Sequence, residues 1–245
     1  HDRLATAVES LCVWAVALWL PTLRYRTLSD IVLRRVRGLL EIGDAMRVQC
    51  CLLLVLSVLF SDTDAQTTKE SQATAVAAIK KLGGRVTLDE KNPSRPVVGV
   101  SLFGQKVTDA SLEHLKGLTS LQNLELTNTK VTGIGFVHLK QLPSLQSLNL
   151  IATKVTDTGL VHLKTLTSLQ TLWISGGKVT DVGLLHIKEM RSLQSLSLDA
   201  QVTDVGLAQL NGLNSLTFLG LGQTQVTDSG LVYLKGLKRL QTLML

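Results

Sequence analysis

The chain has 245 residues, of which 45% are hydrophobic and 4% aromatic, so an ordered core must be built from aliphatic side chains. Its three cysteines, Cys12, Cys50 and Cys51, all precede residue 52, which excludes a disulfide framework and a thiolate metal site from the rest of the chain. The net charge of +6 lies in residues 66–245, which hold 18 Lys or Arg against 12 Asp or Glu, whereas residues 1–65 hold seven of each. Because these charges are spread out, we predict no nucleic-acid partner.

Residues 1–45 form an upstream segment whose origin the sequence leaves open. An apolar run from Leu11 to Leu20 ends at Pro21, and five arginines follow between residues 24 and 37. The segment is either sequence from outside the native reading frame, with Met46 as the true start, or a genuine cytoplasmic extension. We favour the first interpretation. The chain begins with His and stops on the last leucine of a repeat, so we also expect a fragment that lacks its C-terminal cap.

Residues 46–65 have the pattern of a secretory signal. Met46-Arg47 gives a basic start, Cys50 to Phe60 is a run of eleven nearly continuous apolar residues, and Ala65 is a small residue suited to cleavage. A bilayer-spanning helix needs about 20 apolar residues, so this run is too short to cross a membrane. We predict cleavage after Ala65 and a secreted, periplasmic or cell-surface protein. The alternatives are an uncleaved anchor and an ordinary core helix.

Residues 66–96 are predicted to cap the N-terminal end of the domain that follows. Ala73 to Leu82 has a helical pattern that ends at Gly83-Gly84, residues 85–89 suit a short strand, and residues 91–96 form a turn with two prolines. An array of stacked repeats needs such an irregular end unit, because its terminal repeat would otherwise expose the core.

Residues 97–245 consist of about six repeats. The dipeptide Val-Thr recurs in steps of 24, 24, 24, 23 and 24 residues, beginning at Val107, Val131, Val155, Val179, Val202 and Val226. The pattern L-x-x-L-x-L runs in phase with it from Leu121 to Leu245, and Val97, Val100 and Leu102 occupy the same slot at the start. A fixed period of this kind predicts a stacked repeat architecture.

Each repeat is expected to form one short strand and one short helix. Alternation in L-x-L places the leucines inward, and the Thr-Asp that follows stands where an N-cap would accept backbone N–H bonds. After this cap, Leu112, Leu115 and Leu118 form an apolar stripe at a spacing of three residues. Stacking would place parallel strands on the concave side and helices on the convex side. The aspartates are Asp109, Asp157, Asp181, Asp204 and Asp228.

These repeats resemble leucine-rich repeats of the ribonuclease-inhibitor-like and cysteine-containing types, and they are similar to predicted secreted bacterial proteins of that family. The resemblance covers residues 97–245 and implies an α/β fold, a right-handed solenoid in the form of a horseshoe arc. It implies macromolecule binding as the function, with the partner left open. At the position after the strand where the family carries Cys or Asn, this chain has Thr129, Thr153 and Thr224, but Gln105 and Gly177 elsewhere.

Two ladders of repeated side chains suggest chemistry at first sight. His114, His138, His162 and His186 recur every 24 residues beside the apolar stripe, which indicates a solvated helix face rather than a metal site. Lysines recur before Val-Thr and on the helices, and they suit either a soluble exterior or an anion-binding stripe. No unique catalytic constellation is present, so we predict no enzyme activity, no cofactor and no metal. The lysines are Lys106, Lys130, Lys154, Lys178, Lys116, Lys140, Lys164, Lys188 and Lys235.

The outward strand positions vary between repeats while the inward aliphatic residues hardly change. Exposed aromatic residues on a rigid sheet are typical binding anchors, and Trp173 is the leading candidate. The stretch Leu198 to Val202 is one residue shorter than its counterpart, and we favour harmless variation in loop length as the explanation. The alternative is that the short turn helps to shape a pocket with Trp173 and Phe218 as walls. The candidate partner-binding residues are Phe103, Glu125, Asn149, Ile151, Trp173, Ser197 and Phe218.

The predicted function is that of a non-catalytic protein–protein interaction module of an exported or surface protein, binding a protein or peptide through the concave strands. One alternative is an envelope or structural protein whose basic exterior contacts anionic polymer or lipid. Another is an intracellular substrate-recognition adaptor of the ubiquitin-ligase kind, although residues 1–45 contain no clear F-box-like segment. Membrane contact is expected only through an uncleaved signal or an undetected domain, and the oligomeric state is left open.

Overall fold

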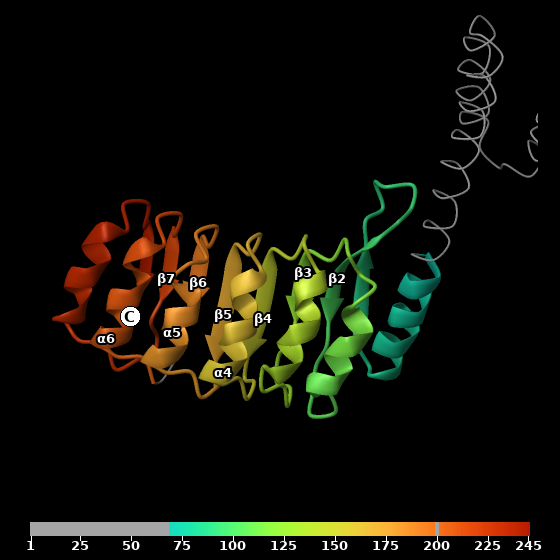
Figure 1. Ribbon diagram of the computed structural model, residues 1–245, viewed down its shortest axis with the longest axis horizontal. Helices are drawn as coiled ribbons and strands as arrows, with labels where there is room; N and C mark the ends of the chain where they lie inside the picture. The colour runs from blue at the N-terminus through green and yellow to red at the C-terminus, as the bar shows by residue number, and fades with distance from the viewer. Residues whose placement is uncertain (1–68, 199–200) are drawn as a thin grey trace, which may run out of the picture. The chain divides into compact units, whose positions relative to one another are not determined.

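The computed structural model describes residues 69–198 and 201–245 (Figure 1). The upstream segment and the predicted signal therefore lie outside the described residues, as do Asp199 and Ala200 of the short turn. Among the described residues, no helix combines the length and the apolar character needed to cross a membrane.

The described residues form a single sheet in which the strands follow one another in chain order. Strands β2 to β8 pair in parallel, whereas β1 pairs with β2 in the antiparallel direction. Each repeat therefore adds one strand beside the strand of the repeat before it. The strands are β1 (Arg85–Leu88), β2 (Val97–Ser101), β3 (Asn123–Glu125), β4 (Ser147–Ile151), β5 (Thr171–Ser175), β6 (Ser195–Ser197), β7 (Phe218–Gly220) and β8 (Thr242–Met244).

The strands are aligned so that equivalent positions of successive repeats lie side by side. Leu148 of β4 pairs with Leu172 of β5, and Leu172 pairs with Leu196 of β6. Each of these three leucines has an exposed fraction of 0%, and Leu124 and Leu219 at the same position have 2% and 0%. The predictions of parallel strands and of buried central leucines are therefore confirmed.

A second layer of short helical segments lines one side of the sheet (Figure 1). Among the described residues between β2 and β8, five of these segments are 3₁₀-helical and three are α-helical, so the segments are tighter than expected. The stripe of Leu112, Leu115 and Leu118 repeats every three residues, which is the period of a 3₁₀ helix. The segments are η3 (Asp109–Leu115), η4 (Ile134–Gln141), α4 (Asp157–Leu160), η5 (Val161–Thr165), α5 (Asp181–Ile187), α6 (Asp204–Ala208), η6 (Gln209–Gly212) and η7 (Gly230–Gly236).

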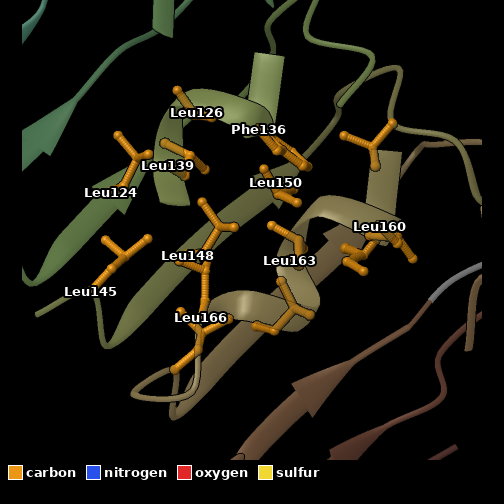
Figure 2. Close-up of a cluster of buried hydrophobic side chains, with 14 of the residues drawn as sticks. Leu124, Leu126, Phe136, Leu139, Leu145, Leu148, Leu150, Leu160, Leu163 and Leu166 are labelled. Carbon is orange, nitrogen blue, oxygen red and sulfur yellow. The ribbon is translucent and has the colours of Figure 1, made fainter. Parts of the chain in front are cut away.

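The core lies between the two layers and is almost entirely aliphatic. Figure 2 shows strand leucines such as Leu148 and helix leucines such as Leu163 pointing into the same layer. Phe136, which is fully buried, takes the place that Leu160 and Leu184 occupy in later repeats. Burial of apolar area at roughly 25 cal/mol per Å² stabilises this arrangement, and each repeat depends on its neighbours for that burial.

The N-terminal unit of the described residues is a helix followed by a strand. Residues 69–81 are α-helical, which confirms the expected helix and extends it by about one turn toward the N-terminus. Ala75 and Ile79 on this helix are buried against the core. Strand β1 then pairs Thr87 with Gly99 of β2, so the sheet continues one strand beyond the first repeat.

In three repeats, a threonine hydroxyl holds the turn that follows the strand. The side chain of Thr129 donates a hydrogen bond of 2.9 Å to the carbonyl of Leu126, and Thr153 and Thr224 do the same to carbonyls three residues earlier. Thr129 and Thr153 are buried, so a polar side chain is tolerated there because its hydroxyl has a partner.

Four of the Thr-Asp motifs, those of Asp109, Asp157, Asp181 and Asp204, connect their own repeat to the following one. The carboxylate of Asp157 accepts hydrogen bonds from the backbone N–H and from the hydroxyl of Thr180, and each bond is 2.8 Å long. We call this contact, in which an Asp holds the Thr of the next repeat, the Asp–Thr clasp. The other such pairs are Asp109 with Thr132, Asp181 with Thr203 and Asp204 with Thr227.

The sequence placed either the threonine or the aspartate of Thr-Asp at the N-cap, and the structure selects the threonine. Helix capping is performed by the threonines, because the hydroxyls of Thr180 and Thr203 accept from the backbone N–H groups of Val182 and Val205 at 3.2 Å. The aspartate is thereby left to bind the neighbouring repeat. In the pair of Asp204 with Thr227, the backbone N–H and the hydroxyl of Thr227 hold the pKa of Asp204 below its usual value.

The clasp also explains the glycine two residues after Asp181, Asp204 and Asp228. A Cβ atom added to Gly183 would collide with the carboxylate of Asp157 in the preceding repeat. Gly206 meets Asp181 in the same way. Glycine is required at this position because the neighbouring carboxylate occupies the space of a side chain.

Asp109 makes the most extensive of these contacts. Its carboxylate accepts from the backbone N–H of Thr132 at 3.1 Å, from the hydroxyl of Thr132 at 2.8 Å, and from the N–H groups of Gly133 and Gly135 at 3.0 and 2.9 Å. Burial acts to raise the pKa of Asp109, but the bonds from Gly135, Thr132 and Gly133 outweigh it and hold this pKa below its ordinary value of 3.8.

Candidate protein-binding surface

The side of the sheet that faces away from the helices presents the outward side chains of β2 to β8. We call this surface the strand face. Its residues come from equivalent positions of successive repeats, so Glu125, Asn149 and Trp173 lie next to one another on β3, β4 and β5. Parallel strands about 4.8 Å apart hold these side chains at fixed spacing on a rigid support.

A shallow hollow of about 250 Å³ lies on the strand face over β1 to β5. Its floor includes the backbone of β2 at Gly99, where the missing side chain leaves space between neighbouring outward residues. A Cβ atom at Gly99 would lie 3.1 Å from Cβ of Thr87, so β1 and β2 approach closely there. The other side chains that line the hollow on its outer side are Ser101, Asn123, Glu125, Ser147, Asn149 and Trp173.

Glu125 is half-buried in this hollow, and two hydroxyl groups hold its carboxylate. The hydroxyl of Ser101 donates to Oε2 at 2.9 Å, and the hydroxyl of Thr127 donates to Oε1 at 3.4 Å. Within the described part of the chain, no Lys, Arg or His forms an ion pair with Glu125. The carboxylate is thus oriented by neutral donors and retains free acceptor sites.

Trp173 lies at the end of the hollow that is farthest from β1. Its side chain has an exposed fraction of 39%, and its indole N–H donates a hydrogen bond of 3.2 Å to the hydroxyl of Ser195 on β6. This bond restricts the ring, so a partner that contacts it does not have to immobilise a freely rotating side chain.

The hollow includes three of the seven candidate binding residues, namely Glu125, Asn149 and Trp173. Half-buried Ile151 is on the strand face, and Phe103, with an exposed fraction of 43%, follows the end of β2, but neither lines the hollow. Ser197 and Phe218 likewise do not line it.

The hollow beside Trp173 therefore does not have Phe218 as its other wall. Phe218 pairs with Ser195 and is two strands away from β5, whereas the hollow extends from Trp173 toward β1. The proposed contribution of the short turn falls on Asp199 and Ala200, which are outside the described residues. Thr87 and Gly99 are part of the hollow but were not among the candidates, because their role depends on the antiparallel pairing of β1.

The helix side carries the histidine and lysine ladders. His114 is exposed, whereas His138, His162 and His186 are half-buried. Across residues 69–198 and 201–245, no three His, Cys, Asp or Glu side chains are grouped so that they could hold a metal ion. The lysines before Val-Thr are all exposed, namely Lys106, Lys130, Lys154 and Lys178.

Solved structures of other proteins resemble this arrangement of strands and helices. Internalin C2 from Listeria monocytogenes matches with a TM-score of 0.52 and 26% sequence identity, over 70% of this chain and 72% of that chain. A leucine-rich-repeat protein from Leptospira interrogans gives a TM-score of 0.46 at 22% identity, over 54% of this chain and 33% of that one. An internalin (InlF) from Listeria monocytogenes gives 0.39 at 20% identity, with 70% and 67% covered.

The chain matches no protein-family model and no curated protein sequence. The likeness to internalin C2 concerns the fold, and the chain itself shows a repeated sequence, parallel strands and a leucine core. Together, these observations identify the fold of this chain as a leucine-rich-repeat solenoid.

Proposed function

We propose that the chain is a non-catalytic interaction module that binds a protein or peptide partner on its strand face. The observation that carries this proposal is Trp173, a partly exposed aromatic side chain that is held in place beside a hollow on a rigid sheet. Aromatic anchors of this kind supply most of the affinity in many protein interfaces. We also propose that the repeats belong to the ribonuclease-inhibitor-like or cysteine-containing types.

The division of roles between the two faces of each strand supports this proposal. The inward positions are aliphatic in every repeat and have exposed fractions near zero in β3 to β7. The outward positions next to them carry Glu, Asn, Trp, Ser and Gly in succession from Glu125 to Gly220. The framework does not require these outward residues, so they are available for recognition.

Trp173→Ala should weaken binding of a strand-face ligand by more than about 1 kcal/mol while leaving the melting temperature nearly unchanged. Because the ring is partly exposed, it contributes more to a complex than to the core. Peptides selected from a random display library on the immobilised chain serve as ligands, with fluorescence anisotropy for affinity and circular dichroism for melting. Tyr233→Ala is the matched control, since Tyr233 is an aromatic residue of 44% exposed fraction on η7 in the helix layer.

Two results would assign Trp173 to the framework instead. One is a loss of stability that equals the loss of binding, and the other is unchanged affinity for every selected peptide. If Tyr233→Ala weakens binding while Trp173→Ala does not, the partner surface is on the helix side.

We propose in addition that the protein is exported, so that this surface meets its partner outside the cytoplasm. The support for this is the sequence pattern of residues 46–65, which lie outside the described residues. Expressed from Met46 in a secreting host, the mature protein should begin at Gln66, and N-terminal sequencing of the purified product measures this. A product that retains residues before Ala65 would instead indicate an uncleaved anchor.

The exposed lysine ladder supports a second candidate function, in which the exterior contacts an anionic polymer or lipid. Lys106, Lys130, Lys154 and Lys178 recur at the same position, and none of them forms an ion pair within the described residues. Exposed charges are screened at an ionic strength of about 0.1 M, so such binding should fall steeply with salt. The affinity of a partner anchored by Trp173 should fall far less as the salt concentration is raised.

A further inference from the structure

We propose that the hollow on the strand face receives one basic side chain, Arg or Lys, from the partner, with Glu125 as its counter-ion and Trp173 as its aromatic wall. This inference rests on the proposed function, because it names the chemistry that the strand face recognises. It assigns a cationic side chain of the partner to the hollow, although this chain itself has a net charge of +6.

The distribution of charge on the strand face favours a cation. Among the outward positions of β2 to β8 that the structure describes, Glu125 is the only charged residue. The lysines of the solenoid are on its turns and helical segments, and none of them neutralises Glu125 within the described residues. The nearest cation on this side of the sheet is Arg85 of β1, which pairs with Ser101 and lies two strands from Glu125. It forms no ion pair with Glu125 within the described residues, so the hollow is a local negative site.

The hydrogen bonds of Glu125 prepare it for a partner with several donors. Ser101 and Thr127 each use one acceptor site of the carboxylate, which offers about four such sites in total. Both hydroxyls donate to the carboxylate, so they fix its orientation. Arg and Lys carry only donors, which makes them the natural complement to the remaining sites.

The size and the walls of the hollow suit one side chain rather than a separate small ligand. Its volume of about 250 Å³ is below the range of roughly 300–1,000 Å³ that is typical of small-molecule pockets. Trp173 borders the hollow two strands away from Glu125, and Asn149 lies between them. The long stem of Arg or Lys can pack along the indole ring while its charged head reaches the carboxylate.

Other side chains would fit this site less well. An acidic residue would face the carboxylate of Glu125 at close range and be repelled. An apolar residue would remove water from Glu125 without replacing its hydrogen bonds, which is unfavourable for a charged group. A basic residue pairs its charge with the carboxylate of Glu125 and packs its stem against the ring of Trp173.

The test uses peptides selected from a random display library on the immobilised full chain. Selected peptides are synthesised in pairs, with each basic residue kept or replaced by a neutral isostere, citrulline for Arg and acetyl-lysine for Lys. The wild-type chain should prefer the basic member of a pair by at least about tenfold, and Glu125→Gln should reduce this preference to less than about twofold. Glu125→Gln keeps one oxygen acceptor for one hydroxyl and offers an amide N–H to the other, so the fold should persist.

Glu189→Gln is the matched control, because it removes the same charge from an exposed position just after α5 and should leave the preference intact. This inference is overturned, and the proposed function stands, if peptide binding depends on Trp173 but shows no preference for the basic member of a pair. The same holds if Glu125→Gln keeps the full preference for the basic member. If peptide binding depends on neither Trp173 nor Glu125, or if no peptide is selected, both are overturned. Selection of acidic peptides would point instead to the lysine ladder.

Discussion

Replacing Leu172 with alanine is expected to lower the free energy of unfolding by about 2–5 kcal/mol. Leu172 has an exposed fraction of 0% in the centre of β5 and pairs with leucines on both sides. The truncation removes apolar contacts and leaves a cavity that the stacked repeats cannot fill. Urea unfolding followed by circular dichroism measures the change, and the broken layer should also loosen the adjacent repeats.

Leu243→Ala is the matched control for this experiment. Leu243 occupies the same register position on β8, but its exposed fraction is 38%. Its truncation should therefore cost clearly less than that of Leu172. Equal losses of unfolding free energy at the two positions would mean that burial of the central strand leucine does not stabilise the fold.

Asp109→Ala is expected to lower the free energy of unfolding by about 1–3 kcal/mol, because it leaves backbone N–H groups without a partner. Gly133 and Gly135 are buried, so water does not readily replace the lost acceptor. The same urea titration measures this change. Asp228→Ala is the control, since Asp228 is exposed and its carboxylate accepts no hydrogen bond from the described residues. A loss of stability as large in the control would show that the clasp of Asp109 contributes nothing specific.

The same contact has a pH signature whose sign follows from the lowered pKa of Asp109. A carboxyl with a lower pKa in the folded chain than in the unfolded chain stabilises the fold above its unfolded value, here 3.8. That stabilisation is lost as the pH falls below this value and through the folded-state pKa. In Asp109→Asn, the drop in stability on acidification below about pH 4 should therefore be smaller than in the wild type.

The leucine framework could be predicted from the sequence because one residue type repeats at one spacing. Period-two alternation places Leu148 and Leu150 on the same side of a strand, and every copy of the repeat supports the same assignment. The burial of these leucines and the parallel pairing followed directly. The helical segments were less well predicted, since a spacing of three residues was read as an α-helical stripe although it matches the 3₁₀ period.

The role of the aspartates could not be obtained from local sequence. A Thr-Asp pair before a helix has the signature of an N-cap, and Thr180 does act in this way. The partner of Asp157 is 23 residues further along the chain, so only the stacking of repeats brings the two together. The glycine of Asp-x-Gly was a usable signal, because a glycine inside a helical segment usually marks a close approach.

The candidate surface was predicted in part. Outward positions follow from strand alternation, which is how Glu125, Asn149 and Trp173 were chosen. The boundaries of the hollow depend on β1, an antiparallel strand outside the repeat pattern, and on the bare backbone at Gly99. These features arise from the pairing of two irregular segments, for which the repeat provides no template.

The Asp–Thr clasp has a consequence for how such a chain can change in length. The acceptor Asp and the donor Thr are adjacent in the sequence, so a duplicated repeat brings a Thr for the unit before it and an Asp for the unit after it. Whole copies can thus be inserted or lost without leaving a bond unmatched, whereas a partial copy would shift the leucine register as well. Gly133, which replaces the Asp of one unit and packs against Gly159 of the next, shows that a single junction can diverge while the array persists.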